Sequence, residues 1–282
     1  MPRKVSLHDF QRKRDKGQPI TMLTAYDYPA ARLVDEAGVD AILVGDTLAM
    51  TVLGHRDTVS VTVDDMLHHC KAVARGASRA LLVGDMPFMS YQVSRREAVR
   101  NAGRYMKEAH MDAVKLEGGS EVAATVRAIV AAGVPVMGHV GLTPQTATKL
   151  GGYKVQATSA ETALKLRDDA LALQDAGCFA VVLEAVPAAV AQAVTGKLTI
   201  PTIGIGAGAG CAGQVLVFHD VLGLFDDFVP KFVKQFGQLR EPMLQALQAF
   251  RCEVEAGTFP GEAHSYAMDE SELRRFLQAD KS

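Results

Sequence analysis

Residues 80–117 read ALLVGDMPFMSYQVSRREAVRNAGRYMKEAHMDAVKLE, and this stretch shows the repeating unit of the fold most clearly. It holds two short apolar runs, 80–84 and 113–116, separated by a helical pattern rich in Ala, Arg and Glu at 94–109. The apolar runs show little alternation of polar and apolar residues, which is typical of strands buried on both faces. Two such strands with a helix between them indicate a strand–helix–strand unit in a parallel sheet.

The same unit repeats along the chain. Similar apolar runs lie at 20–25, 41–45, 80–84, 113–116, 135–140, 180–183, 201–206 and 215–218. Helical patterns lie between most of them, at 29–38, 63–75, 94–109, 120–132, 159–176 and 187–195. Eight parallel strands predict an α/β fold, a (β/α)₈ barrel over about residues 20–225, and a doubly wound open sheet is the alternative. The last two units are the weakest, because only about eight residues separate their strands.

Both ends of the chain carry helical patterns outside the predicted barrel. One helix is expected at 6–17, and another at 238–256 is followed by a polar tail, which together give a C-terminal helical extension over about 229–282. A length of 282 residues would suit two domains as well as one. Since no linker divides the sequence, we expect one domain over 1–282.

Composition argues against several classes of protein. The net charge is −2, from 30 basic and 32 acidic residues, and without a dense basic run we expect no nucleic-acid partner. Because the sequence lacks a run of about 18 apolar residues, we expect no membrane span. Cys70, Cys178, Cys211 and Cys252 are widely spaced and no signal peptide is evident, so we expect a location in the reducing cytoplasm.

Polar residues stand where the predicted strands end. Asp46, Asp85 and Glu117 follow the second, third and fourth strands, His139 lies in the fifth, and Glu184 ends the sixth. The carboxyl ends of barrel strands converge on one face, where barrel active sites lie. Like charges packed together need a neutralising cation or proton, and carboxylate oxygens suit Mg²⁺. Helix caps or turn residues are the alternative explanation for each carboxylate.

Three of these positions suggest contacts with a substrate. Lys115 lies two residues before Glu117 and therefore points to the same side of its strand, where a buried lysine would bind an anionic group such as a carboxylate. Its alternative role is a structural ion pair. Glu184 is a candidate general base or a turn residue, and His139 is either a donor to the substrate or a core histidine.

Several longer motifs run from about residue 20 to residue 266. They are TAYDYPAARL at 24–33, VGD at 44–46, GDMPFMSY at 84–91, VKLEGG at 114–119, GHVGLTPQ at 138–145, GGYKVQ at 151–156, VVLEAVP at 181–187, IPTIGIGAG at 200–208 and PGEAHSY at 260–266. In combination they resemble the family of 3-methyl-2-oxobutanoate (ketopantoate) hydroxymethyltransferases.

The resemblance implies a barrel of the phosphoenolpyruvate/pyruvate type and a complete set of site residues. Asp46 and Asp85 resemble metal ligands that also lie against the substrate, and Glu117 resembles a third carboxylate of the metal site, acting through water. Lys115 resembles the substrate-contacting lysine and Glu184 the general base. The implied reaction transfers a hydroxymethyl group from 5,10-methylenetetrahydrofolate to 3-methyl-2-oxobutanoate with Mg²⁺, Mn²⁺ or Co²⁺. The implied assembly is a homo-oligomer, commonly a decamer.

The sequence departs from the family pattern at three positions. Thr47 stands where the family generally has Ser, and its hydroxyl can still bind the substrate carboxylate. Ala49 replaces a usual Gly, and Ala212 replaces a usual Asp. Two other functions remain open at this point, namely a lyase or mutase of the same barrel superfamily that uses no folate, and a non-catalytic paralogue.

Overall fold

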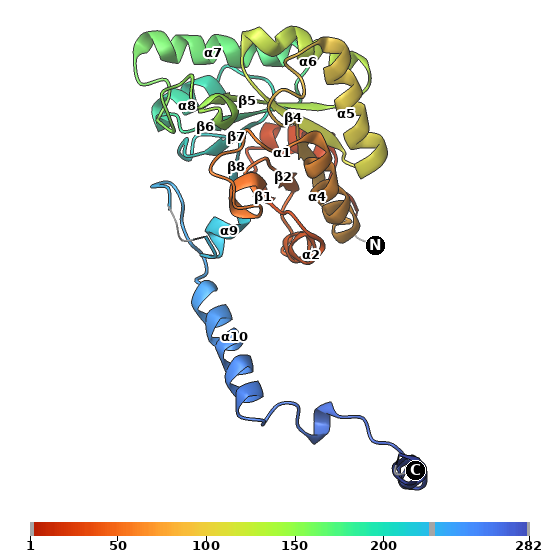
Figure 1. Ribbon diagram of the computed structural model, residues 1–282. Helices are drawn as coiled ribbons and strands as arrows, with labels where there is room; N and C mark the ends of the chain where they lie inside the picture. The colour runs from red at the N-terminus through yellow and green to blue at the C-terminus, as the bar shows by residue number, and fades with distance from the viewer. Residues whose placement is uncertain (1–2, 226–228, 281–282) are drawn as a thin grey trace.

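The structure is a computed structural model that describes residues 3–225 and 229–280. Its centre is a closed barrel of eight parallel strands in chain order, in which β1 also pairs with β8 (Figure 1). This closure confirms the predicted (β/α)₈ barrel and excludes the open sheet. The strands are β1 (Ile20–Thr24), β2 (Ala41–Val44), β3 (Leu81–Asp85), β4 (Ala113–Glu117), β5 (Val136–Gly141), β6 (Ala180–Glu184), β7 (Thr202–Ile205) and β8 (Gly213–Leu216).

Helices cover the outside of the barrel. Helix α4 begins in a capping box, where Thr62 and Asp65 satisfy each other's backbone N–H groups, and Ser159 with Thr162 does the same for α7. The outer helices are α2 (Tyr28–Glu36), α4 (Val63–Gly76), α5 (Arg95–Ala109), α6 (Ala123–Ala131), α7 (Ala160–Asp175) and α8 (Ala188–Thr195). Short helical turns stand in the loops: α3 (Leu48–Thr51), η1 (Ser120–Val122), η2 (Pro144–Thr146), α9 (Phe218–Val221) and η3 (Glu262–His264).

The hydrophobic core has two layers. The larger layer lies between the strands and the outer helices, and the smaller one fills the barrel interior with inward-facing residues such as Met22, Val83 and Met137. Helix α1 (Leu7–Asp15) closes the interior at the end opposite the carboxyl ends of the strands. Its Phe10 is buried and packs edge-on against Phe179, with ring centroids 6.0 Å apart. The barrel is therefore a packed core with a single functional mouth at its other end.

Most predicted bounds agree with the structure to within two residues, and the main differences concern β8, the helix after β4 and the C-terminal tail. Strand β8 begins at Gly213 rather than at 215, because Gly213 pairs with Ile20 and packs so closely that an added Cβ would lie 2.6 Å from the Ile20 carbonyl oxygen. The helix expected at 120–132 begins as the 3₁₀ turn η1. The tail expected to be merely polar contains a further helix, α11 (Glu270–Ala279).

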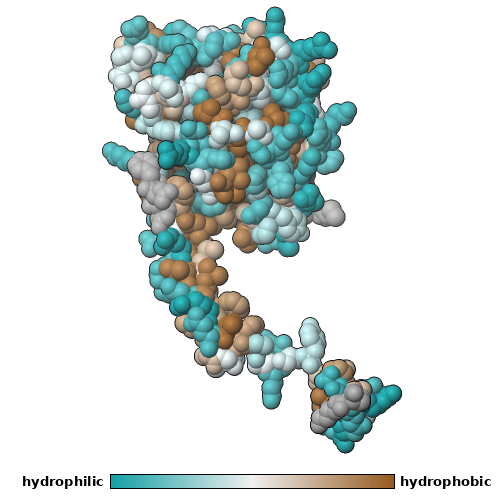
Figure 2. All heavy atoms as spheres, in the orientation of Figure 1, coloured by the Kyte–Doolittle hydropathy of each residue, from teal (hydrophilic) through white to brown (hydrophobic). Residues whose placement is uncertain are grey.

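The C-terminal extension leaves the barrel. Helix α10 (Arg240–Glu255) projects away from it in Figure 1, and every residue of this helix is exposed. Brown, hydrophobic atoms run along the projecting segment in Figure 2. Over the described residues, all helices are too short or too polar to cross a membrane.

Candidate active site

Strand alternation aims three of the predicted site residues into the barrel. On β3, inward-facing Val83 is followed two residues later by Asp85. On β4, inward-facing Ala113 is followed by Lys115 and then by Glu117. Because side chains two residues apart share a face, a regular strand ends with these polar groups at the mouth.

Strands β5 and β6 complete the ring of polar side chains in the same way. His139 follows inward-facing Met137, and Glu184 follows inward-facing Val182. The side chain of His139 is 3% exposed whereas that of Glu184 is 16% exposed, so Glu184 lies closer to the opening. The structure thus brings His139 and Glu184 together with the β3 and β4 residues.

Asp46 reaches the site through a turn rather than through alternation. It lies two residues beyond the end of β2, where the chain turns into α3, and its backbone N–H donates to Asp85 Oδ2 at 3.2 Å. The side chain of Asp46 is buried. Thr47 begins α3 beside it, is half-buried, and its hydroxyl has no hydrogen-bond partner among the described residues.

Lys115 forms the centre of the buried charge cluster. Its Nζ lies 2.8 Å from Asp85 Oδ1 and 3.8 Å from Glu117 Oε1. Burial by itself would favour the neutral amine, but the charges of Asp85 and Glu117 outweigh it and raise the pKa of Lys115. Lys115 is therefore a fixed positive charge inside the barrel mouth.

His139 links two carboxylates across the mouth. Its Nε2 lies 3.2 Å from Glu184 Oε2, and its Nδ1 lies 3.5 Å from Glu117 Oε1 and 3.3 Å from Lys115 Nζ. Burial and the charge of Lys115 oppose protonation, yet the hydrogen bonds to Glu117 and Glu184 prevail and raise the pKa of His139 to about 9. The imidazole is therefore cationic at neutral pH and lies between the two carboxylates.

The carboxylates outnumber these cations. Burial and the neighbouring charges of Asp85 and Glu117 raise the pKa of Asp46 well above its usual range. Burial also raises the pKa of Asp85, with Lys115 acting against it. Burial raises the pKa of Glu117, but the hydrogen bond to His139 lowers it. The hydrogen bond prevails, so the pKa of Glu117 lies below its usual value. Asp85 is thus paired with Lys115, whereas the raised pKa of Asp46 reflects a local shortage of positive charge beside that carboxylate.

The donor set at Asp46 and Asp85 fits a divalent cation that keeps water ligands. Among residues 3–225 and 229–280, no group of three or more His, Cys, Asp or Glu side chains is arranged to hold a metal by itself. Magnesium is usually held by one or two carboxylates, with waters and substrate oxygens completing its shell. Asp46 and Asp85 are adjacent buried carboxylates, of which, within the described ranges, only Asp85 forms an ion pair with a cationic side chain, and together they match this mode of binding.

Sequence reasoning missed two residues that organise the cluster, Gln145 and Tyr91. Gln145 Nε2 donates to Asp46 Oδ2 at 2.9 Å, and the backbone N–H of Gln145 donates to Glu117 Oε2 at 3.1 Å. Tyr91 Oη lies 2.7 Å from Gln145 Oε1. Gln145 is the last residue of the motif GHVGLTPQ, and Tyr91 is the last residue of GDMPFMSY. Their distance from Asp46 along the sequence gives no indication that they lie near it in the fold.

Two glycines allow close packing around the site. An added Cβ on Gly84 would lie 2.4 Å from the Tyr105 ring, whose hydroxyl donates to the Asp85 carbonyl oxygen at 2.6 Å. Gly141 has φ 99°, and an added Cβ would lie 2.3 Å from the Glu184 carbonyl oxygen. Larger side chains at these positions would displace the ends of β3 and β6, and with them Asp85 and Glu184.

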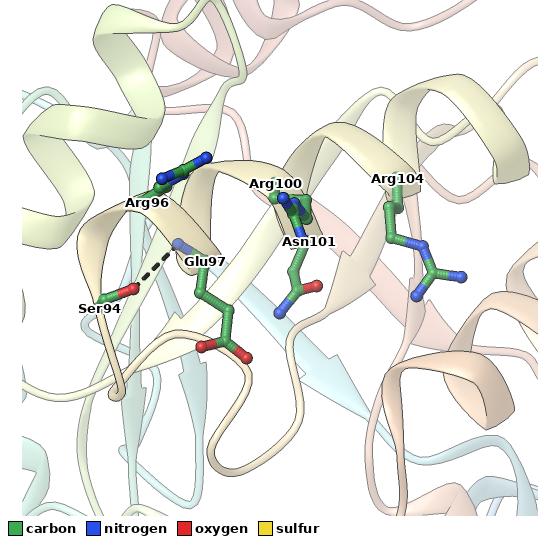
Figure 3. Close-up of a pocket in the computed structure, with 6 residues that line it drawn as sticks. All are labelled: Ser94, Arg96, Glu97, Arg100, Asn101 and Arg104. Atoms are coloured by element: carbon green, nitrogen blue, oxygen red, sulfur yellow. Dashed lines mark hydrogen bonds between the residues drawn. The ribbon is translucent and has the colours of Figure 1, made fainter.

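The hollow in Figure 3 lies away from this cluster, on the outer helix α5. Its lining residues are Ser94, Arg96, Glu97, Arg100, Asn101 and Arg104. The arginines follow one another along the helix, and Arg104 pairs with Asp64 and Glu108 on the surface. None of the predicted site residues lies there.

Comparison with known proteins shows which family this sequence belongs to. The family model described as ketopantoate hydroxymethyltransferase matches residues 4–262. The chain belongs to this family.

Named relatives support the assignment over nearly the whole chain. A 3-methyl-2-oxobutanoate hydroxymethyltransferase from Oleidesulfovibrio alaskensis is 59% identical over 91% of this chain and 89% of its own length. One from Heliobacterium modesticaldum is 55% identical over 96% of this chain and 98% of its own length. The family resemblance is thereby confirmed, and the chain is an enzyme of the transferase class rather than a non-catalytic paralogue.

A solved structure shows the wider fold. The crystal structure of 2,3-dimethylmalate lyase, titled a member of the PEP mutase/isocitrate lyase superfamily, matches with a TM-score of 0.57. It covers 99% of this chain and 97% of its own, at 17% identity. At this identity the likeness shows the barrel fold alone, so it gives no support to a lyase or mutase function.

Proposed function

We propose that this enzyme transfers a hydroxymethyl group from 5,10-methylenetetrahydrofolate to 3-methyl-2-oxobutanoate and forms 2-dehydropantoate, with its chemistry at the carboxylate cluster of the barrel mouth. The observation that carries this proposal is the buried group formed by Lys115, Asp85 and Asp46, in a chain of this family. It combines a fixed cation for a substrate carboxylate with a pair of carboxylates for a metal. An oxo acid presents the matching set of groups, a carboxylate beside a keto oxygen.

Asp46 and Asp85 would hold Mg²⁺, and Glu117 would hold one of its waters. When bound, the metal supplies Lewis-acid stabilisation of the negative charge that develops on the keto oxygen. The raised pKa of Asp46, caused by burial and by Asp85 and Glu117, supports a requirement for positive charge here. Mn²⁺ or Co²⁺ would satisfy the same ligands.

Lys115, Thr47 and His139 would bind and orient the oxo acid. Lys115 is already held by Asp85, so its ammonium group is fixed before the substrate arrives. The hydroxyl of Thr47 has no partner in the described structure and is available to the substrate carboxylate. His139, cationic and buried, adds a second positive group beside the keto acid.

Glu184 would remove the proton from C3 of the oxo acid. It is the most exposed acid of the cluster, so its carboxylate can meet a substrate that enters from the mouth. The resulting carbanion at C3 would form a bond to the methylene carbon of the folate. The bonds from that carbon to the folate nitrogens break, water supplies the hydroxyl group, and tetrahydrofolate leaves with the remaining proton of that water and the proton taken from C3. His139 lies 3.2 Å from Glu184 Oε2 and would favour one orientation of this carboxylate during proton removal.

A folate-dependent turnover assay tests this function. Purified enzyme is given 3-methyl-2-oxobutanoate with and without 5,10-methylenetetrahydrofolate, and with and without EDTA. We expect 2-dehydropantoate only when both the folate and a divalent metal are present. Consumption of the oxo acid without folate would contradict the proposal and favour the lyase or mutase alternative.

We also infer that the chain forms homo-oligomers, up to the decamer implied by the family resemblance, and works in the cytoplasm. Met243, Leu247, Phe250 and Val254 are exposed, and their helical spacing places them on one face of α10. This helix projects away from its own barrel (Figure 1), with hydrophobic atoms along the projecting segment (Figure 2). Exposed apolar faces of this kind are usual at subunit contacts. The four cysteines are all free thiols, which suits a reducing compartment.

Light scattering after size-exclusion chromatography tests the oligomeric state. The wild-type chain should elute as an assembly. Leu247→Asp, which places a charge on the apolar face, should shift it toward smaller species. A wild-type monomer would contradict the inference.

A further inference from the structure

The strongest unassigned feature of the barrel mouth is the hydrogen-bonded environment of Gln145. This residue lies in η2, after β5, and is 3% exposed. Its side-chain Nε2 donates to Asp46 Oδ2 and to the Met86 carbonyl oxygen, both at 2.9 Å. Its Oε1 lies 2.7 Å from the hydroxyl of Tyr91. Both N–H groups of the amide and its oxygen therefore have partners.

These partners permit only one orientation of the amide. Turned over, the oxygen of Gln145 would face the Asp46 carboxylate and the Met86 carbonyl group, which are both acceptors. Tyr91 supports the observed orientation, because its hydroxyl lies closer to Oε1, at 2.7 Å, than to its other acceptor, the Glu117 carbonyl oxygen at 3.1 Å. The same hydroxyl accepts from the backbone N–H of Glu117 at 3.1 Å. Tyr91 is itself 1% exposed, so the arrangement is fixed from both sides.

The same residue also holds a second carboxylate. The backbone N–H of Gln145 donates to Glu117 Oε2 at 3.1 Å. One residue of the β5 loop is thereby bonded to an acid after β2 and to an acid at the end of β4. Gln145 contacts only Oδ2 of Asp46, so Oδ1 of Asp46 has no hydrogen-bond partner in the described part of the chain. The other oxygen of Glu117, Oε1, lies near Lys115 and His139.

We infer that Gln145 is a positioning residue for metal binding, which fixes Asp46 with its side-chain amide and Glu117 with its backbone N–H, and that Tyr91 locks its orientation. The inference rests on the proposed metal-dependent function. Groups that orient metal ligands from behind typically contribute about 10–100-fold to metal affinity or activity. A glutamate at position 145 would add a like charge, and an asparagine is one methylene too short to span the same distance.

Binding of Mn²⁺, followed by electron paramagnetic resonance of the free ion, tests this inference independently of turnover. Gln145→Met keeps the length and apolar volume of the side chain and removes its amide. We expect its Mn²⁺ dissociation constant to rise by about 10–100-fold. Tyr91→Phe keeps the ring and should show a smaller rise, about 10-fold, at the low end of that range. Melting temperatures of all variants report on folding, and Tyr91→Phe carries the test if Gln145→Met does not fold.

Thr146→Val provides the matched control from the same turn. It removes the bond between Thr146 Oγ1 and Thr143 Oγ1, 2.6 Å apart, without touching an acid of the cluster. It should bind Mn²⁺ as the wild type does. Wild-type affinity in Gln145→Met, or an equal loss in Thr146→Val, would overturn the positioning role.

Asp46→Ala separates this inference from the proposed function. If the wild type binds Mn²⁺ and Asp46→Ala does not, while Gln145→Met binds normally, the metal site stands and only the role of Gln145 is wrong. If the wild type binds no metal, both are wrong.

Discussion

Nε2 of His139 lies 3.2 Å from Oε2 of Glu184, and Nδ1 of the same ring lies 3.5 Å from Oε1 of Glu117. One imidazole therefore connects the proposed base on β6 with the acid that ends β4. Burial and Lys115 oppose a charge on this ring, but the two carboxylates prevail and keep it protonated at neutral pH. The proposed base thus lies beside a buried cationic ring.

Replacing Glu184 separates proton removal from metal binding. Glu184→Gln is nearly isosteric, so the fold and Mg²⁺ affinity should persist. The rate should fall by about 10²–10⁴-fold, the usual contribution of a general base. The variant should also lose Mg²⁺-dependent exchange of the C3 hydrogen of 3-methyl-2-oxobutanoate into deuterium oxide, followed by NMR.

The exposed Glu161 of α7 provides the control, because Glu161→Gln should exchange as the wild type does. Exchange by Glu184→Gln as fast as in an exchanging wild type would place the base elsewhere. His139 would then be the next candidate.

The acids of the cluster should differ in their effect on metal affinity. Asp46→Ala and Asp85→Ala each remove a proposed ligand of a weakly held cation and should abolish activity. Glu117→Ala should have a smaller effect, because this acid acts through water. Isothermal titration of Mg²⁺ in the presence of the oxo acid measures the difference. Asp64→Ala removes a surface acid paired with Arg104 and serves as the control. Unchanged affinity in both the Asp46 and Asp85 variants would contradict the metal site.

Lys115→Met should affect catalysis and stability together. The pocket loses its partner for the substrate carboxylate, so KM should rise and kcat should fall. Asp85, buried 2.8 Å from the missing ammonium group, loses its pair, which typically destabilises a protein by about 3–5 kcal/mol in urea unfolding.

Lys71→Met is the matched control for this substitution. It breaks a half-exposed pair with Glu108 at 3.8 Å and should cost at most about 1 kcal/mol. Loss of a group that binds the substrate changes KM or kcat by more than about twofold. If both constants of Lys115→Met stay within that range of the wild type, Lys115 serves only as a member of a structural ion pair.

Asp220 should make folding stability depend on pH. Burial raises its pKa from 3.8 to about 6, so the folded chain binds this proton more tightly than the unfolded chain. The contribution of Asp220 to stability is therefore most favourable below pH 4 and is lost as pH rises toward about 6. Asp220→Asn removes this effect. Its melting temperature relative to wild type should increase between these pH values and level off above them. A difference that does not change with pH would contradict the assignment.

Much of the fold and most of the site were open to prediction from sequence because they depend on local rules. A buried parallel strand is a short apolar run, and alternation with a period of two then aims Asp85, Lys115, Glu117, His139 and Glu184 into one mouth once the barrel closes. The alternation of strand and helix patterns predicted the barrel, and the longer motifs predicted the family. The chemistry assigned to each residue remains a prediction.

Other features depend on contacts between segments far apart in sequence, so they could be seen only once the chain was folded. The turn that brings Asp46 onto Asp85 breaks the alternation rule, and Gln145 contacts Asp46 although 99 positions separate them. Phe10, which belongs to helix α1 and not to a strand, closes one end of the barrel interior. Strand β8 begins at Gly213, where Ile20 leaves no room for a side chain. Periodicity in a sequence encodes which face of a strand or helix is apolar. Which distant backbone or amide supplies a hydrogen bond is fixed only by how the packed elements meet.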